Sequence, residues 1–551
     1  MENTESLCPW LGEGQSKRTI SKPQQRWKMG FISLYDIENN AARLLGACAR
    51  QAGYQFTEIY FKDWINNKFD PPKDCEIERL LELIAAKQCN IVGLSVRASA
   101  YHKVAAQLTS AIRQRFPQIV ILWGGTHTVL APEKCILEAD IVCRGEAEIT
   151  LVELLDRLSA GLDITSLPNI WVKQRPEYKS MQGPGSESSE VCTPIVFKNE
   201  VGPNVQNLDL LPFRDFYSAD KYFIMGRSLE QGDPMVGDSC FQMMNSRGCV
   251  FHCAYCYNSE LSELYKSQGR YYRTRSVSSV LAEIKKARTV FKNMKRIRFD
   301  DEVFLFSDAW YAEFASRYPV EVGLPFEVFT EPKLVKRPLF ELLRRSGLDV
   351  VYMGIQSSCR VNSELYDRSG NDEQLQACAH IFADLGLDAR YHVMMDDKES
   401  TWEDKRHLFD LLMSFPRGSY QLYLFSVVIF PNTMLARKLL AEGKITENDL
   451  EGERNKTFQQ IRVSLNYPRP PEELFWASMF VLVSKRFLSD KFLYFLADNK
   501  FLRRYPKVLA YFAQLCNLIK MAGVALRMTL KGEMTFTLMH RWLNWNSLIS
   551  Q

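Results

Sequence analysis

The chain has 551 residues, 46% of them hydrophobic, so it can bury two or three separate cores. Its formal net charge of +4 is small for this length, and Lys and Arg form no long basic stripe, which argues against nucleic acid as a partner. No apolar run reaches the roughly 18 residues that a membrane-spanning helix needs, so a spanning segment is not expected.

The amino-terminal residues carry no targeting pattern. Met1 to Glu5 are polar and lack the basic and then apolar order of a signal peptide, and residues 1–28 are rich in Ser, Lys and Gln, which predicts a loose tail. Most of the 14 cysteines are isolated along the chain. Scattered cysteines without an export signal predict reduced thiols and a cytoplasmic location.

Residues 29–165 alternate between short apolar runs and amphipathic stretches. This alternation predicts an α/β domain with a parallel sheet covered by helices on both faces, the doubly wound (Rossmann-like) design. Ligands of such sheets lie beyond the carboxyl ends of the strands. The expected strands are 30–35, 56–61, 91–96, 119–123 and 140–143, and the expected helices include 78–87, 103–116, 132–138 and 148–158.

Three of these strand ends carry polar or glycine-rich sequences. Ser95 lies at the end of one strand, Gly124-Gly125-Thr126-His127 follows the next, and Gly145-Glu146 follows the one after that. Paired glycines after a strand let the backbone approach another group closely, although each motif alone is equally typical of a tight turn or an exposed loop. Their positions on successive strand ends indicate one shared ligand site.

On these residues, the stretch from 29 to 165 resembles the cobalamin-binding domain that precedes many radical enzymes. The resemblance implies that the cofactor lies against Ser95, Gly124, Gly125, Thr126, His127, Gly145 and Glu146. The Asp-x-His-x-x-Gly motif that supplies an axial histidine in some relatives would fall at Asp36 to Ala41, where there is no histidine. The resemblance therefore implies cobalt without a histidine ligand, and a domain that binds nothing also remains open.

Residues 166–225 are expected to be a linker, because Gln182 to Ser189 are turn formers without an apolar period. A second alternation of strands and helices then covers residues 226–440. Its six strands predict a partial (β/α)6 barrel of the TIM type, with functional residues at the strands' carboxyl ends. The expected strands are 242–245, 296–299, 326–329, 350–355, 389–395 and 421–428.

Three cysteines follow the first strand of this barrel, as Cys249-x-x-x-Cys253-x-x-Cys256. Thiolates at this spacing can hold one soft metal centre together, and three protein ligands leave one position open, as in a catalytic site. We expect an iron–sulfur cluster here. A structural zinc with Cys240 or His252 as the fourth ligand is the alternative.

Polar residues at the other strand ends indicate a polar small molecule above this centre. Asp300-Asp301-Glu302, Thr330-Glu331, Gln356-Ser357 and Asp396-Asp397 each follow one strand of the barrel, although a single acidic loop is usually just exposed. Donors and acceptors that converge on one rim suit a ligand with an amine, a carboxylate and a ribose.

With Tyr255 before the last cysteine, this motif is similar to the signature of the radical S-adenosylmethionine superfamily. The resemblance implies a [4Fe–4S] cluster on Cys249, Cys253 and Cys256 and S-adenosylmethionine on its open iron. It further implies that Asp300 or Asp301 receives the methionyl amine and that Gln356 and Ser357 lie along the ribose. Relatives more often have Glu in place of Gln356, and their glycine-rich turn after the fifth strand is here Met394 to Asp397.

Residues 441–551 are expected to be helical and are rich in aromatic residues, with basic residues interleaved near Lys500 to Tyr505. A helical cap on the barrel is the simpler interpretation. A lid over an apolar substrate pocket, or a peripheral contact with a membrane surface, is the alternative.

Together, the two resemblances imply a cobalamin-dependent radical enzyme, most simply a methyltransferase that acts on an unactivated carbon through a 5′-deoxyadenosyl radical and methylcobalamin. An oxidative cyclase or rearrangement enzyme with the same cofactors, and a non-catalytic iron–sulfur or zinc module, remain as alternatives. The expected partners are a small-molecule or lipid-like substrate and an electron donor such as flavodoxin or ferredoxin. The sequence singles out no catalytic side chain, because the cofactors would carry the chemistry.

Overall fold

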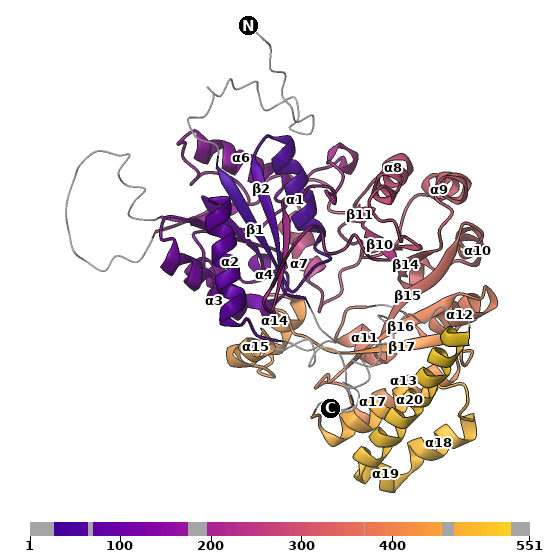
Figure 1. Cartoon of the computed structure of the whole chain (residues 1–551). Helices are drawn as coiled ribbons and strands as arrows, with labels where there is room; N and C mark the ends of the chain where they lie inside the picture. The colour runs from indigo at the N-terminus through magenta and orange to yellow at the C-terminus, as the bar shows by residue number, and fades with distance from the viewer. Residues whose placement is uncertain are drawn as a thin grey trace.

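The computed structural model describes residues 27–63, 70–174, 195–368, 370–454, 465 and 468–530. These residues form two α/β parts, each built on its own sheet, and a group of carboxy-terminal helices (Figure 1). This arrangement confirms the expected fold class, and the first strand of each part, Lys28–Leu34 and Cys240–Met243, begins two residues before the strand that the alternation predicts.

The first sheet has β1 near its centre and helices on both faces. Its five central strands are almost continuously buried, as in a parallel sheet covered on two sides; six of the seven residues of β1 are buried. Helices α2 and α3 cover one face, with Leu80 and Leu108 in the core, and α1 and α6 cover the other, with Leu45 and Leu154. The strands are β1 (Lys28–Leu34), β2 (Gln55–Phe61), β3 (Ile91–Ser95), β4 (Val120–Gly124) and β5 (Ile141–Cys143), and the helices are α1 (Asn40–Gln51), α2 (Asp74–Lys87), α3 (His102–Arg115), α4 (Thr126–Leu130), α5 (Pro132–Glu138) and α6 (Glu148–Ser159).

Both edges of this sheet are extended by the segment that the sequence suggested to be a linker. The nine strands have the order β7-β6-β5-β4-β3-β1-β2-β8-β9. One edge is formed by β6 (Ile170–Lys173) and β7 (Val196–Lys198), and the other by β8 (Lys221–Met225) and β9 (Ser228–Gln231). These strands are three to five residues long, and the whole of the turn-forming stretch 182–189 that suggested a linker lies outside the described residues.

The second sheet has six parallel strands in the order β10-β13-β14-β15-β16-β17, which is the partial barrel that the sequence predicts. In β15, Val351, Met353 and Ile355 face the helices, whereas Tyr352 and Gln356 lie half-exposed on the opposite face. The strands are β10 (Cys240–Met243), β13 (Arg296–Phe299), β14 (Phe326–Thr330), β15 (Leu348–Gln356), β16 (Asp388–Met395) and β17 (Tyr420–Ser426), and the covering helices are α8 (Val277–Arg288), α9 (Asp308–Glu321), α10 (Arg337–Arg345), α12 (Asp372–Asp384) and α13 (Trp402–Met413).

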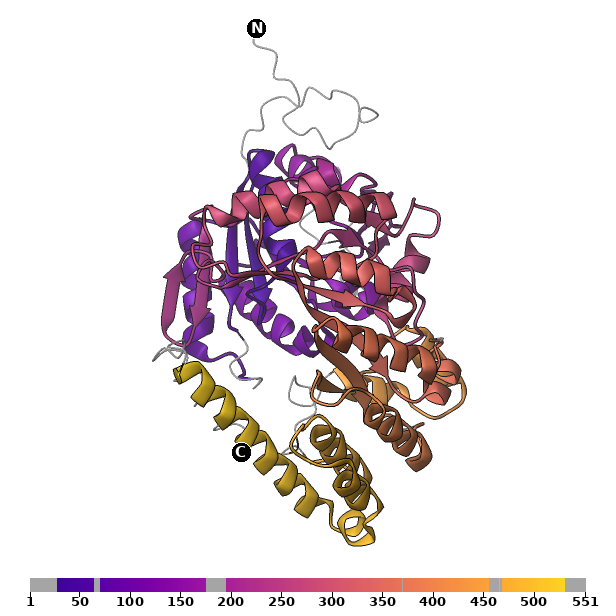
Figure 2. The ribbon, with the colours of Figure 1, turned by 90° about the vertical axis from the view of Figure 1, so that its right-hand side faces the viewer.

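The carboxy-terminal helices pack on the barrel through α17, whose Phe475, Trp476 and Phe480 belong to the barrel's own core. Figure 2 shows the long helix α20 at the periphery of the molecule. Among the described residues, no helix is both long and apolar enough to cross a bilayer. The helices that follow the barrel are α14 (Met434–Ala441), α15 (Glu447–Arg454), α17 (Pro471–Val483), α18 (Asp490–Asp498), α19 (Lys500–Arg504) and α20 (Pro506–Leu530).

Candidate functional site

The three cysteines lie in one loop between β11 (Ser246–Arg247) and α7 (Tyr257–Leu264), and all three are half-buried. Gly248, directly before the first of them, has φ +80°, and a Cβ there would lie 2.5 Å from the carbonyl oxygen of Tyr271. Only glycine fits this turn. Inside the loop, the Cys256 amide donates to the Cys253 carbonyl at 3.0 Å, which keeps the last two cysteines on one turn.

These thiols are arranged for a metal cluster better than for a single ion. Ligand atoms of one tetrahedral zinc lie roughly 3.8 Å apart, because Zn–S bonds are about 2.3 Å long. Within the described part of the chain, two groups bring three potential ligand atoms within 4.8 Å of one another, and the three cysteines form neither of them. His252 is exposed, and Cys240 lies at the opposite end of β10, so neither of the two fourth ligands that the sequence offers is buried beside the three thiols.

The three acidic residues of the turn after β13 have different hydrogen-bond partners. Asp300 accepts from Arg298 Nε at 2.6 Å, and Glu302 accepts from the Tyr257 hydroxyl at 2.6 Å. Asp301 is buried, and its Oδ1 accepts from the amides of Asn245 and Ser246 at 2.7 and 2.5 Å. Its Oδ2 has no partner among the described residues, and burial raises the pKa of this carboxyl to about 7.

The end of β15 lies beside the motif tyrosine. Gln356 has φ +66°, a conformation that non-glycine residues rarely adopt, and Ser357 is buried next to it. The buried Arg368 donates to the Gly354 carbonyl at 2.7 Å, to Glu331, and to the Tyr255 hydroxyl at 3.3 Å. Sequence reasoning missed Arg368, because it follows a short helix and belongs to no motif.

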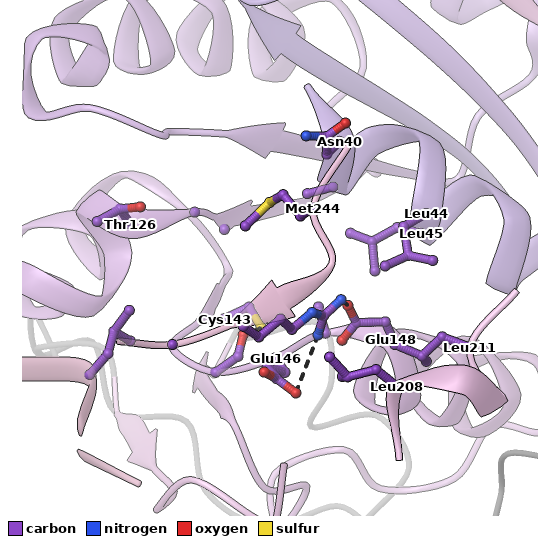
Figure 3. Close-up of a pocket in the computed structure, with 18 of the residues that line it drawn as sticks. Asn40, Leu44, Leu45, Thr126, Cys143, Glu146, Glu148, Leu208, Leu211 and Met244 are labelled. Atoms are coloured by element: carbon purple, nitrogen blue, oxygen red, sulfur yellow. Dashed lines mark hydrogen bonds and ion pairs between the residues drawn. The ribbon is translucent and has the colours of Figure 1, made fainter. Parts of the chain in front are cut away.

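Two domains share one cavity of about 420 Å³ (Figure 3). The loops after β3, β4 and β5 line it from the first domain, and the stretch that leads into the cysteine loop lines it from the second. The apolar part of the wall comes from α1 and from the segment before the barrel; Figure 3 shows Leu44 and Leu45 across the cavity from Thr126. The predicted residues that line the cavity are Ser95, Gly124, Gly125, Thr126, Gly145 and Glu146, and unpredicted ones include Asn40, Leu208, Leu211, Asn258, Tyr265 and Tyr271.

Local contacts explain the residue types of Ser95, Gly125 and Gly145 in this wall. Ser95 Oγ accepts from Asn39 Nδ2 at 3.0 Å, which leaves the Ser95 proton for a ligand. Gly125 has φ +107°, and a Cβ there would lie 2.8 Å from the Val96 carbonyl oxygen. A Cβ on Gly145 would lie 2.8 Å from the Tyr265 hydroxyl. Only Gly124 has open space, since its Cβ would meet Cys143 alone, at 3.9 Å.

Two residues that the resemblance assigned to the cofactor have other contacts. His127 is fully buried, does not line the cavity, and shares hydrogen bonds of 3.0 Å with Ser99 Oγ and with His102 Nδ1. Its side chain packs under the turn rather than facing a ligand. Glu146 does line the cavity, but Arg273 and Arg247 of the second domain bind its carboxylate.

The residues that stand in place of the axial-histidine motif, within Asp36 to Ala41, have contacts of their own. Glu38 stands where that motif has its histidine, and it accepts from Gln242 Nε2 at 2.6 Å, across the junction of the two domains. Asn39 caps α1 by accepting from the Ala42 amide, and Asn40 faces the cavity. Glu38 is thus engaged with the second domain.

Two family models match the chain. Residues 31–155 match the B12 binding domain, and residues 245–412 match the radical SAM superfamily. The first range covers the five central strands of the first sheet apart from the first three residues of β1, and the second covers β13 to β16 of the second sheet.

The chain spans between one third and just over half of the length of the curated relatives that it matches. An uncharacterized methyltransferase PH0819 of Pyrococcus horikoshii is 24% identical over 52% of this chain and 56% of its own. Cytidylyl-2-hydroxyethylphosphonate methyltransferase of Streptomyces wedmorensis is 27% identical over 49% of this chain and 51% of its own. An anaerobic magnesium-protoporphyrin IX monomethyl ester cyclase of Synechocystis is 25% identical over 35% of this chain and 33% of its own.

Solved structures share the fold. The cobalamin-dependent S-adenosylmethionine radical enzyme OxsB, with aqua-cobalamin and S-adenosylmethionine bound, has a TM-score of 0.59 at 15% identity, over 95% of this chain and 84% of its own. The radical S-adenosylmethionine methyltransferase TsrM from Kitasatospora setae has a TM-score of 0.58 at 14% identity, over 75% of this chain and 76% of its own. Residues 31–155 therefore form a B12-binding domain and residues 245–412 a radical SAM domain, and the chain belongs to the proteins that join these two domains in this order.

Proposed function

We propose that the protein is a cobalamin-dependent radical SAM methyltransferase that acts on an unactivated carbon. The observation that supports this proposal is a cavity shared by the strand ends of the B12-binding domain and by the residues that flank the three cysteines, 246–248 before them and 257–258 after them. Glycine-rich loops of the B12-binding domain and the stretch that leads into the three cysteines line the same space of about 420 Å³. Two separate binding modules would have no need of a common wall.

The residues around the cysteine loop fit a cluster and S-adenosylmethionine. Cys249, Cys253 and Cys256 would hold a [4Fe–4S] cluster. Asp301 Oδ2 and Asn258 Nδ2 are buried near this loop without a hydrogen-bond partner among the described residues, and such atoms are costly unless a ligand engages them. In this proposal a carboxylate of the acidic turn receives the methionyl amine, and Gln356 and Ser357 lie along the ribose.

The wall of the first domain fits a corrinoid. Ser95 offers a proton, Gly124 leaves the backbone open to a flat ligand, and Gly125, Thr126 and Gly145 line the same space. His127 is not part of this proposed site, and Glu146 acts by holding the two domains together.

When bound, these groups supply one-electron cleavage of a carbon–sulfur bond and a transferable methyl group. The chain's own part is to hold the ligands in line and to keep water out. Leu44, Leu45, Leu208 and Leu211 give the cavity an apolar wall that excludes water. Arg368 fixes the Tyr255 ring over the cysteine loop through its hydrogen bond.

The curated relatives support methyl transfer, since two of the three are methyltransferases by name. The cyclase relative keeps ring closure on the same cofactors as a second candidate. Because the matched regions span only about half of these relatives, the substrate is not carried over from them. We propose a small-molecule or lipid-like substrate, a flavodoxin or ferredoxin as electron donor, and the reducing cytoplasm as the location.

Anaerobic reconstitution tests the proposal. Protein loaded with iron, sulfide and hydroxocobalamin should form 5′-deoxyadenosine from S-adenosylmethionine and dithionite, and Cys253→Ala should not. The mass of the product then separates the candidates, because methylation adds one CH₂ unit and ring closure removes hydrogen. A preparation with four irons per chain that forms no 5′-deoxyadenosine would favour a non-catalytic iron–sulfur module instead.

A further inference from the structure

Helix α20 carries an exposed apolar stripe along its length. Val508, Tyr511, Leu515 and Leu526 are 49, 69, 54 and 62% exposed, and Leu518, Ile519 and Ala522 fill the interval between them. Residues at this three- and four-residue spacing lie on one face of a helix. From Val508 to Leu526 the stripe is about 27 Å long, at 1.5 Å of rise per residue.

This stripe is a second apolar face and not the packing face of the helix. The opposite face of the helix is buried and consists of Leu509, Ala510, Ala513 and Cys516. All of these except Ala510 belong to the core that α17 shares. A helix that only capped the barrel would need one apolar face. Figure 2 shows α20 at the edge of the molecule, away from the helices that cover the barrel.

The neighbouring helices extend the same kind of surface. Phe492 and Phe495 of α18 stack on each other, and Phe495 is 60% exposed. Phe501 of α19 is 59% exposed and packs on Tyr505, which is exposed as well. Exposed aromatic rings next to an aliphatic stripe are typical of segments that lie at a membrane–water interface.

Positive charge concentrates in this region. Residues 486–530 contain eight Lys and Arg but only two Asp, whereas the whole chain has a net charge of only +4. Lys500, Arg504, Lys507 and Lys520 are exposed among the aromatic and aliphatic residues. The two acidic residues, Asp490 and Asp498, pair with Arg417 and Arg406 of the barrel domain, and Asp498 also lies 3.6 Å from Arg503 of this surface.

We infer that α18, α19 and α20 form a peripheral docking surface for an anionic lipid bilayer. The apolar stripe and the aromatic rings would enter the headgroup region, and the exposed lysines and arginines would lie against lipid phosphates. This inference does not depend on the proposed function, since it rests on a part of the chain that lies outside both family models.

Vesicle flotation of the full chain tests this inference. We expect binding to vesicles of phosphatidylcholine mixed with phosphatidylglycerol, weaker binding to phosphatidylcholine alone, and release by high salt. Lys500→Gln, Arg504→Gln and Lys507→Gln should each lower the partition coefficient about fivefold, and the double variant Leu515→Asp/Leu518→Asp should lower it further.

Leu137→Asp and Val320→Asp are matched controls, because these side chains are 72 and 86% exposed elsewhere on the molecule. They should leave vesicle binding unchanged, and thermal unfolding should be the same for all variants. Absence of binding to the anionic vesicles, or equal binding by the stripe variant, would overturn the inference. So would a dimer that the stripe variant converts to a monomer, because a second copy of the chain would then cover the stripe.

Discussion

Arg247 places its guanidinium 3.3 Å from Oε2 of Glu146, so the loop that bears the cysteines is tied to the end of a strand in the other domain. Arg273 binds the second oxygen of Glu146 at 2.5 Å. Burial alone would raise the pKa of Glu146, but the two arginines outweigh it, and the net pKa lies below its ordinary value. Glu146 is therefore an ionised link between the two halves of the cavity.

Replacing Glu146 by Gln should lower the free energy of unfolding by about 2 kcal/mol, because Arg273 and Arg247 lose the charge that compensates their burial. The same change should weaken corrinoid binding, since the cavity wall loses its anchor. Chemical denaturation and gel filtration with hydroxocobalamin measure the two effects.

The matched control is Glu153→Gln. Glu153 pairs with Arg157 at 2.7 Å one turn away on α6, with both side chains about a quarter exposed. Such a pair contributes about 0.5 kcal/mol at most, and corrinoid binding should not change. Equal effects of the two variants would contradict the linking role of Glu146.

Cysteine replacements test the ligand set of the cluster. Cys249→Ala, Cys253→Ala and Cys256→Ala should each lose most of the bound iron after anaerobic reconstitution, because each removes one of three thiolate ligands. Cys240→Ala should keep it, since Cys240 lies at the far end of β10. Iron and zinc analysis gives the outcome; loss of a single zinc in Cys240→Ala would restore the zinc alternative.

The order of elements was predictable because apolar periodicity marks buried strands and amphipathic helices directly. The six strands of the barrel and the five central strands of the first sheet all follow that signal. Edge strands such as Ile170–Lys173 were missed, although central strands as short as Ile141–Cys143 were predicted. Their pairing depends on the sheet that they join.

The candidate site was predictable where chemistry follows spacing along the chain, as in Cys249 to Cys256. The site was not predictable where contacts join segments that lie far apart in the sequence. Nothing near Arg368 in the sequence indicates that it reaches Tyr255, 113 residues away. His127 shows the opposite case: its place in a glycine-rich motif suggested a ligand contact, yet the helix that begins at Thr126 turns its ring into the protein.

The buried carboxyl of Asp301 should make stability depend on pH. Its pKa in the folded protein is about 7, raised by burial from its ordinary value of 3.8. Between these two values the native protein holds a proton that the unfolded chain releases, so the free energy of unfolding falls as the pH rises through this window. Above pH 7 the loss amounts to up to about 4 kcal/mol, at 1.4 kcal/mol per pKa unit.

Asp301→Asn should remove this dependence, because Asn cannot ionise and its oxygen can still accept from Asn245 and Ser246. Before metal loading, the variant should match the wild type near pH 4 and exceed it in stability at pH 8. Asp163→Asn, in an exposed turn, should leave the profile unchanged. Denaturation across this pH range is the measurement; a variant that is less stable than the wild type at pH 8 would refute the assignment.

The paired glycines allow the role of the cavity to be separated from the stability of its wall. Gly125→Ala should cost more than about 2 kcal/mol, because the residue has φ +107° and its new Cβ would lie 2.8 Å from the Val96 carbonyl oxygen. Any loss of corrinoid binding in that variant would follow from the disturbed turn. It therefore says little about where the ligand lies.

Gly124→Ala is the informative partner, because its Cβ would touch only Cys143, at 3.9 Å, and would otherwise occupy the cavity. Its stability should stay within about 1 kcal/mol of the wild type, since alanine at an unstrained position also reduces the freedom of the unfolded chain. Its affinity for hydroxocobalamin, read from the absorbance of the bound cofactor, should nevertheless fall at least several-fold, because one methyl group intrudes where the ligand must approach the backbone. Unchanged affinity with unchanged stability would mean that the corrinoid does not approach this strand end, and the proposed corrinoid site would then have to be abandoned.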